Sequence, residues 1–259
     1  MRMTSETPPN WQELLAQGRA GEAQAHYRLS EAPSGDTYDA LKTLASVQEA
    51  TREKSYAKAL ERLQRLETKP DLTDWDALKQ NLDVIKDAAE NLDKRRDPEA
   101  ALTTLEPLNH PLLNAEAETL RGTANVLMNE TDTARSHFER AVTLDPKHYR
   151  AITNLGNLAL EAGQTDEAIQ AYERSLKLNE SFPNAHHNLG VAYRRKGQIN
   201  KSVRHLRKAQ NATQRQMREE ARTTLRSGAG QSWSKYGRWV LYAVIAVAVF
   251  LALRATGTL

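Results

Sequence analysis

Residues 149–182 read YRAITNLGNLALEAGQTDEAIQAYERSLKLNESF, and this stretch decides the fold. Its pattern occurs once before and once after it at a spacing of 34 residues, so that three copies fill residues 115–210. A fixed period of this length is typical of stacked helical repeats. The residues that return in all three copies are Gly122, Gly156 and Gly190; Ala134, Ala168 and Ser202; Phe138, Tyr172 and Leu206; and Ala141, Ser175 and Ala209.

Each copy predicts a pair of helices joined by a tight turn. Gly156 on the first helix lets the second helix approach closely, and Ala168 keeps the crossing point of the two helices small. Gly163 ends the first helix, because glycine adopts a positive φ without steric strain. Tyr172 continues the buried stripe of the second helix. One hairpin cannot cover both of its faces, so we expect neighbouring hairpins to stack.

At these residues the sequence resembles the tetratricopeptide repeat family. The segments ETLRGTANVLMNETDTARSHFERAVTLDP, YRAITNLGNLALEAGQTDEAIQAYERSLKLN and PNAHHNLGVAYRRKGQINKSVRHLRKAQ are similar to three successive repeats, and Pro146 stands where the family has a proline. The resemblance implies an all-α solenoid of tetratricopeptide-type hairpins. It also implies a concave groove, lined by the first helices, that binds a protein or peptide partner.

Residues 10–114 depart from the regular pattern but continue its logic. We expect three degenerate hairpins there, with the small residue of each second helix at Ala23, Ala59 and Ala100. Asn10, Asp74 and Asp97 have the side chains that cap helix N-termini. The predicted helices cover about 37–51, 55–66 and 75–91, and a short helix opens at Pro98.

The composition excludes several kinds of site. The chain has no cysteine, which rules out disulfides and thiolate zinc sites. No Walker, HExxH or GxSxG motif is present, and SGAGQS at 227–232 is interpreted as a linker. His186 and His187 point about 100° apart on a helix, so we expect one to pack inside the hairpin. We therefore expect no catalytic, cofactor or metal site, and we interpret Glu116, Glu118 and Asp132 as solvated.

Charge is distributed unevenly along the chain. Residues 1–200 carry 25 Lys and Arg against 31 Asp and Glu, whereas 201–238 carry 10 against two. We interpret the basic stretch as a solvated cap with charges that orient membrane insertion, and attraction to anionic lipid headgroups is the second interpretation. Nucleic acid is disfavoured, because residues 201–226 contain no interleaved aromatic side chain and match no known module.

An apolar run near the end predicts a single transmembrane helix. Residues 239–253, from Trp239 to Leu253, read WVLYAVIAVAVFLAL. A helix of this length spans about 22 Å against a hydrocarbon core of roughly 30 Å. Arg238 and Arg254 flank the run and can snorkel to the headgroups. The alternatives are a helix buried in the soluble domain and an interfacial helix, but the run has no polar face.

The charges that flank this run predict its orientation. Arg222, Arg226, Lys235 and Arg238 precede it and only Arg254 follows it, so we expect the N-terminal domain in the cytoplasm. The first ten residues, MRMTSETPPN, contain no apolar run of the kind found in signal peptides. Together these features correspond to a single-pass, tail-anchored protein.

The resemblance also implies which residues face the groove. The candidates are Asn154, Asn157, His187, Asn188 and Val191. Some tetratricopeptide domains clamp the C-terminal carboxylate of a peptide with asparagine and basic side chains. Asn157 and Asn188 match two such positions, although Thr153 stands where the family has lysine. The basic positions would be Arg218 and Arg222, if a new helix starts near Met217.

The sequence therefore predicts a membrane-anchored scaffold that binds a segment of a partner protein in its groove. The alternative is a subunit of a larger membrane complex for transport or assembly, whose transmembrane helix makes contacts through Ala243, Ala246 and Ala248. An enzyme is disfavoured.

The predicted divisions of the chain are a tail at 1–9, degenerate hairpins at 10–114, regular repeats at 115–210, a basic capping helix at 211–226, a linker at 227–238, the membrane helix at 239–253 and a tail at 254–259. The capping helix either continues the preceding helix or starts anew.

Overall fold

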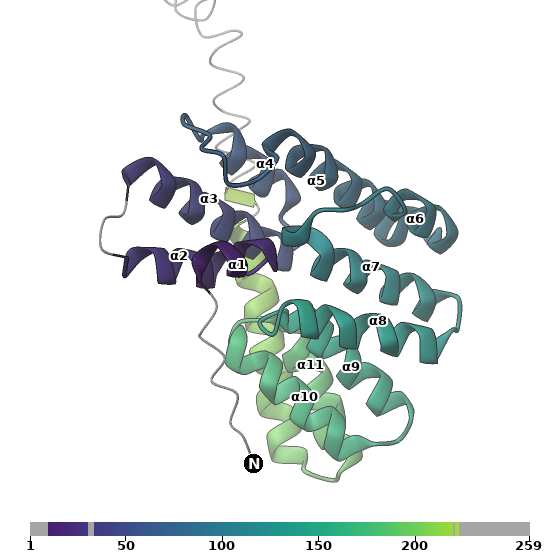
Figure 1. The fold of residues 1–259 in the computed structure, drawn as a ribbon. Helices are drawn as coiled ribbons and strands as arrows, with labels where there is room; N and C mark the ends of the chain where they lie inside the picture. The colour runs from purple at the N-terminus through teal and green to yellow at the C-terminus, as the bar shows by residue number, and fades with distance from the viewer. Residues whose placement is uncertain (1–9, 31–33, 220, 223–259) are drawn as a thin grey trace, which may run out of the picture.

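A computed structural model describes residues 10–30, 34–219 and 221–222, and all regular structure in these residues is helical. Figure 1 shows the helices folded back on one another in succession and stacked into a curved solenoid, with α7 to α11 below α5 and α6. The elements are α1 (Trp11–Ala16), α2 (Ala20–Arg28), α3 (Gly35–Arg52), α4 (Tyr56–Gln64), α5 (Trp75–Glu90), the π-helix η1 (Asn91–Arg95), α6 (Pro98–Leu105), the 3-10 helix η2 (Pro111–Leu113), α7 (Asn114–Leu127), α8 (Thr131–Leu144), α9 (Tyr149–Glu161), α10 (Thr165–Leu178) and α11 (Pro183–Arg195). The last is the helix of residues 199–219, here called the final helix, and residues 221–222 are also helical.

Within the described residues the helices pair into six hairpins. The pairs are α1 with α2, α3 with α4, α5 with α6, α7 with α8, α9 with α10, and α11 with the final helix. The side chains of Asn10, Asp74 and Asp97 accept hydrogen bonds from the first turns of α1, α5 and α6, as the sequence predicted. The all-α solenoid is thus present in both the regular and the irregular halves of the described chain.

One turn geometry recurs in all six hairpins. A left-handed backbone residue follows the C-cap of the first helix at Gly18, Lys54, Asn129, Gly163 and Gly197, and Arg96 has the same backbone directly after η1. The next residue then donates its N–H to a carbonyl five residues back, as from Gln164 to Ala159 at 2.9 Å, which closes a Schellman turn. In the α5–α6 turn the bond runs from Asp97 to Asn91, six residues back, because the π-helix adds one residue.

A small buried residue follows each of these turns by five positions. These residues are Ala23, Ala59, Ala101, Ala134, Ala168 and Ser202, and none is more than 3% exposed. The prediction of Ala100 was wrong by one position, since Ala100 is half-buried and Ala101 is fully buried. The prediction applied the 34-residue period backwards from Ala134. The distance from Ala101 to Ala134 is 33 residues, because the segment between α6 and α7 contains the extra helix η2 and does not follow the period.

The glycines at the repeat period permit close helix packing. A Cβ atom placed on Gly156 would lie 2.7 Å from Cε1 of Tyr172, and one on Gly122 would lie 2.6 Å from Cε1 of Phe138. Both distances are shorter than a non-bonded carbon contact, so any larger residue would force the two helices apart. The close approach of the helices at the periodic glycine was predicted from the sequence, and the structure adds that the periodic large residue is its direct packing partner.

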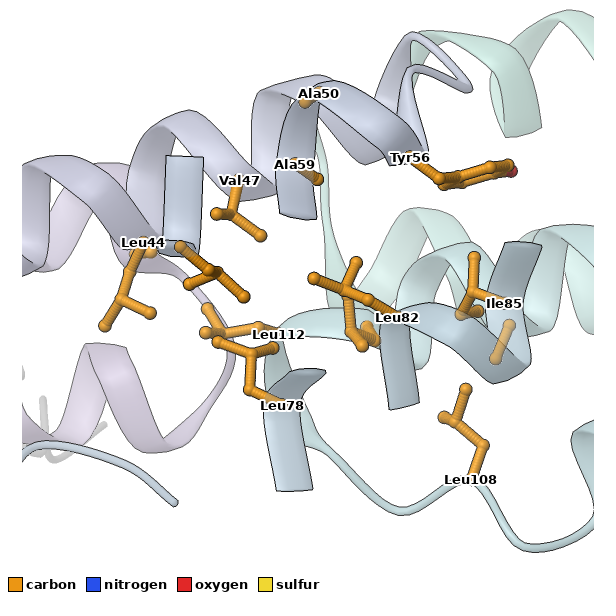
Figure 2. Close-up of a cluster of buried hydrophobic side chains, with 14 of the residues drawn as sticks. Leu44, Val47, Ala50, Tyr56, Ala59, Leu78, Leu82, Ile85, Leu108 and Leu112 are labelled. Carbon is orange, nitrogen blue, oxygen red and sulfur yellow. The ribbon is translucent and has the colours of Figure 1, made fainter. Parts of the chain in front are cut away.

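The largest apolar cluster among the described residues lies in the irregular half. Figure 2 shows side chains of α3, α4 and α5 pointing toward one another. Leu44 and Val47 of α3 meet Leu78 and Leu82 of α5, and all four are fully buried. The cluster continues through α6 into α7. The hairpins within residues 10–114 differ from the repeats in sequence, yet they form a continuous core.

Several predicted segments lie outside the described residues. These are the tail at 1–9, the linker at 227–238, the membrane helix at 239–253 and the tail at 254–259. Within residues 10–30, 34–219 and 221–222, no helix is both long and apolar enough to cross a bilayer. The final helix is continuous through residue 219, so residues 211–219 extend the second helix of the last hairpin.

The recurring turn leads to a prediction about stability. Arg96 holds a left-handed backbone with φ of 57°, a conformation that disfavours residues with a Cβ atom by about 1–2 kcal/mol. Arg96→Gly should therefore raise the free energy of unfolding by up to about 1 kcal/mol, after the greater entropy of glycine in the unfolded chain is subtracted. The measurement is urea unfolding in mild detergent, followed by helical circular dichroism.

The opposite change gives the matched control. Gly163 has φ of +80° and nothing lies within 4 Å of the position where its Cβ would stand, so only the backbone is affected. Gly163→Ala should lower the free energy of unfolding by about 1 kcal/mol. Unaltered stability in Gly163→Ala, or a loss in Arg96→Gly, would contradict the assigned turn geometry.

Candidate peptide-binding site and a buried charged cluster

Five of the seven candidate groove residues lie on two neighbouring first helices. Asn154 and Asn157 are on α9, and His187, Asn188 and Val191 are on α11. His187 is exposed, and the other four are half-buried. The helices α9 and α11 are the first helices of two consecutive hairpins, and they contact each other directly. The regular repeats therefore place these five residues near one another on the first-helix side of the solenoid.

Two of the candidates are joined by a hydrogen bond. The Asn188 Nδ2 donates to Asn157 Oδ1 at 2.7 Å, and the Tyr172 hydroxyl donates to the same oxygen at 2.9 Å. Tyr172 is fully buried and fills the space above Gly156, so its hydroxyl has a fixed position. The periodic residues that pack the hairpin thus also orient the asparagine at its surface.

This arrangement leaves a defined set of polar groups for a partner. Both lone pairs of Asn157 Oδ1 are used, whereas its Nδ2 has no hydrogen-bond partner in the part of the chain that the structure describes. A side-chain amide offers two N–H donors, and Asn188 adds a carbonyl oxygen as an acceptor. A peptide main chain offers complementary acceptors and donors. Because Tyr172 fixes the first amide in advance, a ligand bound here would cost less conformational entropy.

The two arginines of the predicted carboxylate clamp lie elsewhere. Arg218 and Arg222 belong to the final helix and the residues just after it, and both are exposed. No new helix begins near Met217, because the chain there contains no glycine, proline or capping residue and stays helical through residue 219. The condition under which these arginines would occupy first-helix positions is therefore not met in the structure.

Two hollows of the surface are separate from these candidates. One, of about 210 Å³, is lined by Trp11 and Leu15 of α1 together with Leu72, His110 and Pro111. The other, of about 430 Å³, lies between α3 and the end of α4 and is lined mainly by charged and polar side chains. Neither includes a candidate groove residue.

The interpretation of the acidic residues as solvated was wrong for Glu116 and Glu118. Glu116 is 1% exposed, and its carboxylate accepts hydrogen bonds from the Tyr56 hydroxyl at 2.5 Å and from Arg150 Nη1 at 2.9 and 3.0 Å. Glu118 is 8% exposed and forms ion pairs with neighbouring basic side chains. Asp132 is exposed, as predicted.

The proton positions in the Glu116 cluster follow from its geometry. His148 caps α9, and its Nδ1 accepts from the Ala151 N–H at 3.3 Å. The ring proton is therefore on Nε2, which donates to Glu116 at 2.9 Å. Burial by itself would raise the pKa of Glu116, but Arg150, His148 and Tyr56 together lower it to about 2. The carboxylate is charged and fully compensated inside the protein.

The cluster connects parts of the solenoid that are not sequence neighbours. Tyr56 begins α4, whereas Glu116 is on α7 and Arg150 is on α9. Beside it, Arg52 at the end of α3 forms a bidentate ion pair with Asp145, in which Nε and Nη2 donate to the two carboxylate oxygens at 2.6 and 2.9 Å. The second hairpin is therefore bonded to the fourth and fifth.

Part of this cluster was detectable in the sequence. Glu116 and Arg150 are 34 residues apart, so they occupy the same position in successive repeats and carry opposite charges. Equivalent positions of stacked repeats lie near each other, and this spacing could have revealed the pair. Tyr56 lies in an irregular hairpin outside the period, and nothing in the pattern pointed to it.

The adjacent histidines separate as predicted. His186 is 4% exposed and packs between α11 and the final helix, where its Nδ1 lies 3.1 Å from Nδ1 of His205. His187 is exposed on the other side of the helix. No group of three or more His, Asp or Glu side chains arranged to hold a metal ion is found among the described residues.

The Glu116 cluster predicts how stability depends on acidity. The pKa of Glu116 is lower in the folded protein than its ordinary value of 4.5, so its contribution is complete above about pH 4.5 and is lost as the pH falls toward 2. In Glu116→Gln this part of the acid sensitivity should disappear. The variant should also be less stable at neutral pH by about 3–5 kcal/mol, because Arg150 stays buried without its counter-charge.

Thermal unfolding followed across this pH range tests both statements. Glu61→Gln is the control, since Glu61 pairs with Arg65 on the surface and should change stability by less than about 1 kcal/mol. If Glu116→Gln and Glu61→Gln behave alike, the buried cluster does not stabilise the fold.

Comparison with known proteins gives similarity to one family and to several solved structures. Three family models described as tetratricopeptide repeats or TPR repeat match residues 137–170, 156–197 and 183–215. Comparison with curated protein sequences gave no match. A crystal structure of MamA is 22% identical, with a TM-score of 0.43, and the match covers 66% of this chain and 96% of that chain. MamA from Desulfovibrio magneticus RS-1 is 19% identical, with a TM-score of 0.42 and coverages of 69% and 97%.

Proposed function

Since this chain is a tetratricopeptide repeat protein, matched by models of that family across residues 137–215, we propose that it is a non-catalytic scaffold that binds a segment of a partner protein and holds it at a membrane. The binding surface is the first-helix side of α9 and α11. The observation that carries this proposal is the hydrogen-bonded pair of Asn157 and Asn188, which Tyr172 orients from inside the repeat.

The chemistry of this surface favours an extended peptide as the ligand. The asparagines supply donors and acceptors for a peptide main chain, and Val191 beside them supplies apolar contact. His187 is exposed one residue before Asn188 and can contact side chains of the ligand. Because α9 and α11 belong to consecutive repeats with the same geometry, the surface continues along the axis of the solenoid rather than ending in an enclosed pocket.

Membrane attachment is the second part of the proposal. Residues 239–253 are fifteen consecutive residues without a charged side chain, and their summed insertion free energy is on the order of −3 to −5 kcal/mol. Basic residues gather on the N-terminal side of this run, which favours a cytoplasmic location for the repeats. A partner held at the membrane by the repeats would have a raised local concentration there.

Isosteric substitution tests the peptide site. In Asn157→Asp the carboxylate still accepts the bonds from Tyr172 and Asn188 but has no N–H to offer a ligand. The repeat should stay folded, whereas affinity for the partner should fall by about 10-fold or more. The measurement is capture from detergent-solubilised membranes, followed by titration of a peptide from the captured protein.

The control is Asn81→Asp, which changes a half-buried asparagine on α5, far along the chain from this surface. It should leave the captured amount unchanged. Equal capture by wild type, Asn157→Asp and a combined variant of His187 and Asn188 would exclude this surface as the binding site.

Two aspartates test the membrane helix. Val244→Asp with Val247→Asp should add about 5–7 kcal/mol to insertion, which exceeds the favourable free energy of the run. The wild-type chain should stay in the membrane pellet after alkaline extraction, and this variant should move to the supernatant. Val244→Ala with Val247→Ala is the control and should stay in the pellet. Extraction of the wild type itself would refute the anchor.

A further inference from the structure

The final helix carries all of its basic residues on one face. From residue 199 to 218 the chain has six Lys and Arg and no Asp or Glu, and Glu219, Glu220 and Arg222 follow. Six of the basic residues form what we call the basic stripe: Lys201, Arg204, Lys208, Arg215, Arg218 and Arg222. Successive members are three, four, seven, three and four residues apart, which is helical spacing. At 3.6 residues per turn they fall, together with Arg207, in an arc of about 120°.

This arc faces away from the rest of the protein. The opposite face of the final helix packs on α11, where Ser202 and Ala209 are buried and Leu206 fills the space above Gly190. All seven basic side chains are exposed. None of the ion pairs found within the described residues involves them, although Lys201, at the edge of the stripe, lies 5.0 Å from the ring centre of Tyr193. The stripe is therefore a line of exposed positive charge about 32 Å long, and Glu219 is the one acidic residue of the described helix that falls on its face.

We propose that the basic stripe lies against a bilayer surface that contains anionic phospholipid. A straight, flat line of cations on a helix fits a planar layer of negative headgroups, and each Lys or Arg near such a surface contributes attraction that adds to that of the others. The inference rests on the membrane attachment proposed above. It adds that the repeats are not suspended freely from the anchor but are held by one side against the surface.

The position of the stripe in the chain supports this partner. Residues 223–238 separate it from the apolar run, and even a fully extended chain of that length covers at most about 55 Å. If residues 239–253 insert, the stripe stays within this distance of the headgroups and can reach them. Nucleic acid is the rival ligand for a basic surface. Residues 199–222 contain no Phe, Trp or Tyr on which a base could stack, which favours the bilayer.

The orientation has a consequence for the peptide site. The stripe faces away from α11, whereas Asn188 and His187 lie on α11 itself. If the stripe lies on the bilayer, the final helix is between the lipid and α11. The residues Asn188 and His187 on α11 are then held away from the lipid. The partner would then reach the repeats without competing with the membrane for the same surface.

The test separates the stripe from the anchor. All variants carry Val244→Asp and Val247→Asp, so that insertion of the apolar run does not mask surface binding. In this background Arg204→Gln, Lys208→Gln and Arg215→Gln neutralise the stripe. The matched control removes the same charge elsewhere through Lys79→Gln, Lys147→Gln and Lys177→Gln, three exposed lysines. Binding is measured by co-sedimentation with vesicles of phosphatidylcholine, with and without phosphatidylserine.

The background protein and the control should bind vesicles that contain phosphatidylserine and should not bind pure phosphatidylcholine. Neutralising the stripe should lower partitioning onto the anionic vesicles by about 100-fold, and added salt should weaken the binding of the background protein. Equal partitioning of the stripe variant and the control would overturn the proposal. So would tighter binding to a DNA duplex than to anionic vesicles at the same salt, if it is lost in the stripe variant.

The outcome is independent of the anchor. Extraction of the wild-type chain from membranes by alkali would refute the transmembrane helix but would leave the result for the stripe unaffected. A wild-type chain that resists extraction, together with a stripe that does not bind anionic vesicles, would refute the stripe and leave the anchor intact.

Discussion

Close approach of two helix backbones is the constraint on which this structure depends. Each hairpin brings its helices together at a residue with almost no side chain, and the regular repeats place a glycine opposite a large side chain at that point. Tyr172 shows how much follows from this contact, because it fills the space above Gly156 and its hydroxyl orients Asn157 at the surface. The same packing that makes the repeat stable therefore also orients a side chain of the surface proposed to bind a peptide.

Simple solenoids are held together by contacts between neighbouring repeats. This protein adds a second kind of contact, in which Glu116, Arg150 and Tyr56 join hairpins that are not adjacent in sequence. A buried ion pair contributes little net stability compared with apolar packing, but it is sensitive to geometry. The cluster links the irregular second hairpin to the regular repeats, and its hydrogen bonds constrain how these two parts pack.

The two proposed activities lie on different helices. The surface with Asn157 and Asn188 is on α9 and α11, and the basic stripe is on the outer face of the final helix, which pairs with α11. The final helix reaches beyond the length of its partner α11, so its positive charges extend past the last repeat toward the proposed anchor. Peptide binding and membrane contact would then be arranged along one rigid element rather than coupled through a flexible joint.

The sequence by itself determined the helical hairpin, its period, its turn at Gly163 and the close helix approach at Gly156, because these depend on residues close together in the chain and repeated three times. It also named Asn157 and Asn188 as candidates, through the resemblance to a family, but not the bond between them. The left-handed backbone at Lys54 and Arg96, the shift from Ala100 to Ala101 and the burial of Glu116 were decided by tertiary structure. At Lys54, Arg96 and Glu116 a residue takes a role that its type disfavours, whereas at Ala101 the length of the linking segment moves the small position by one residue. Glu116 is the extreme example: its carboxylate enters the interior where donors from α4, from α9 and from the α9 cap meet it, and the sequence period points only to its pairing with Arg150.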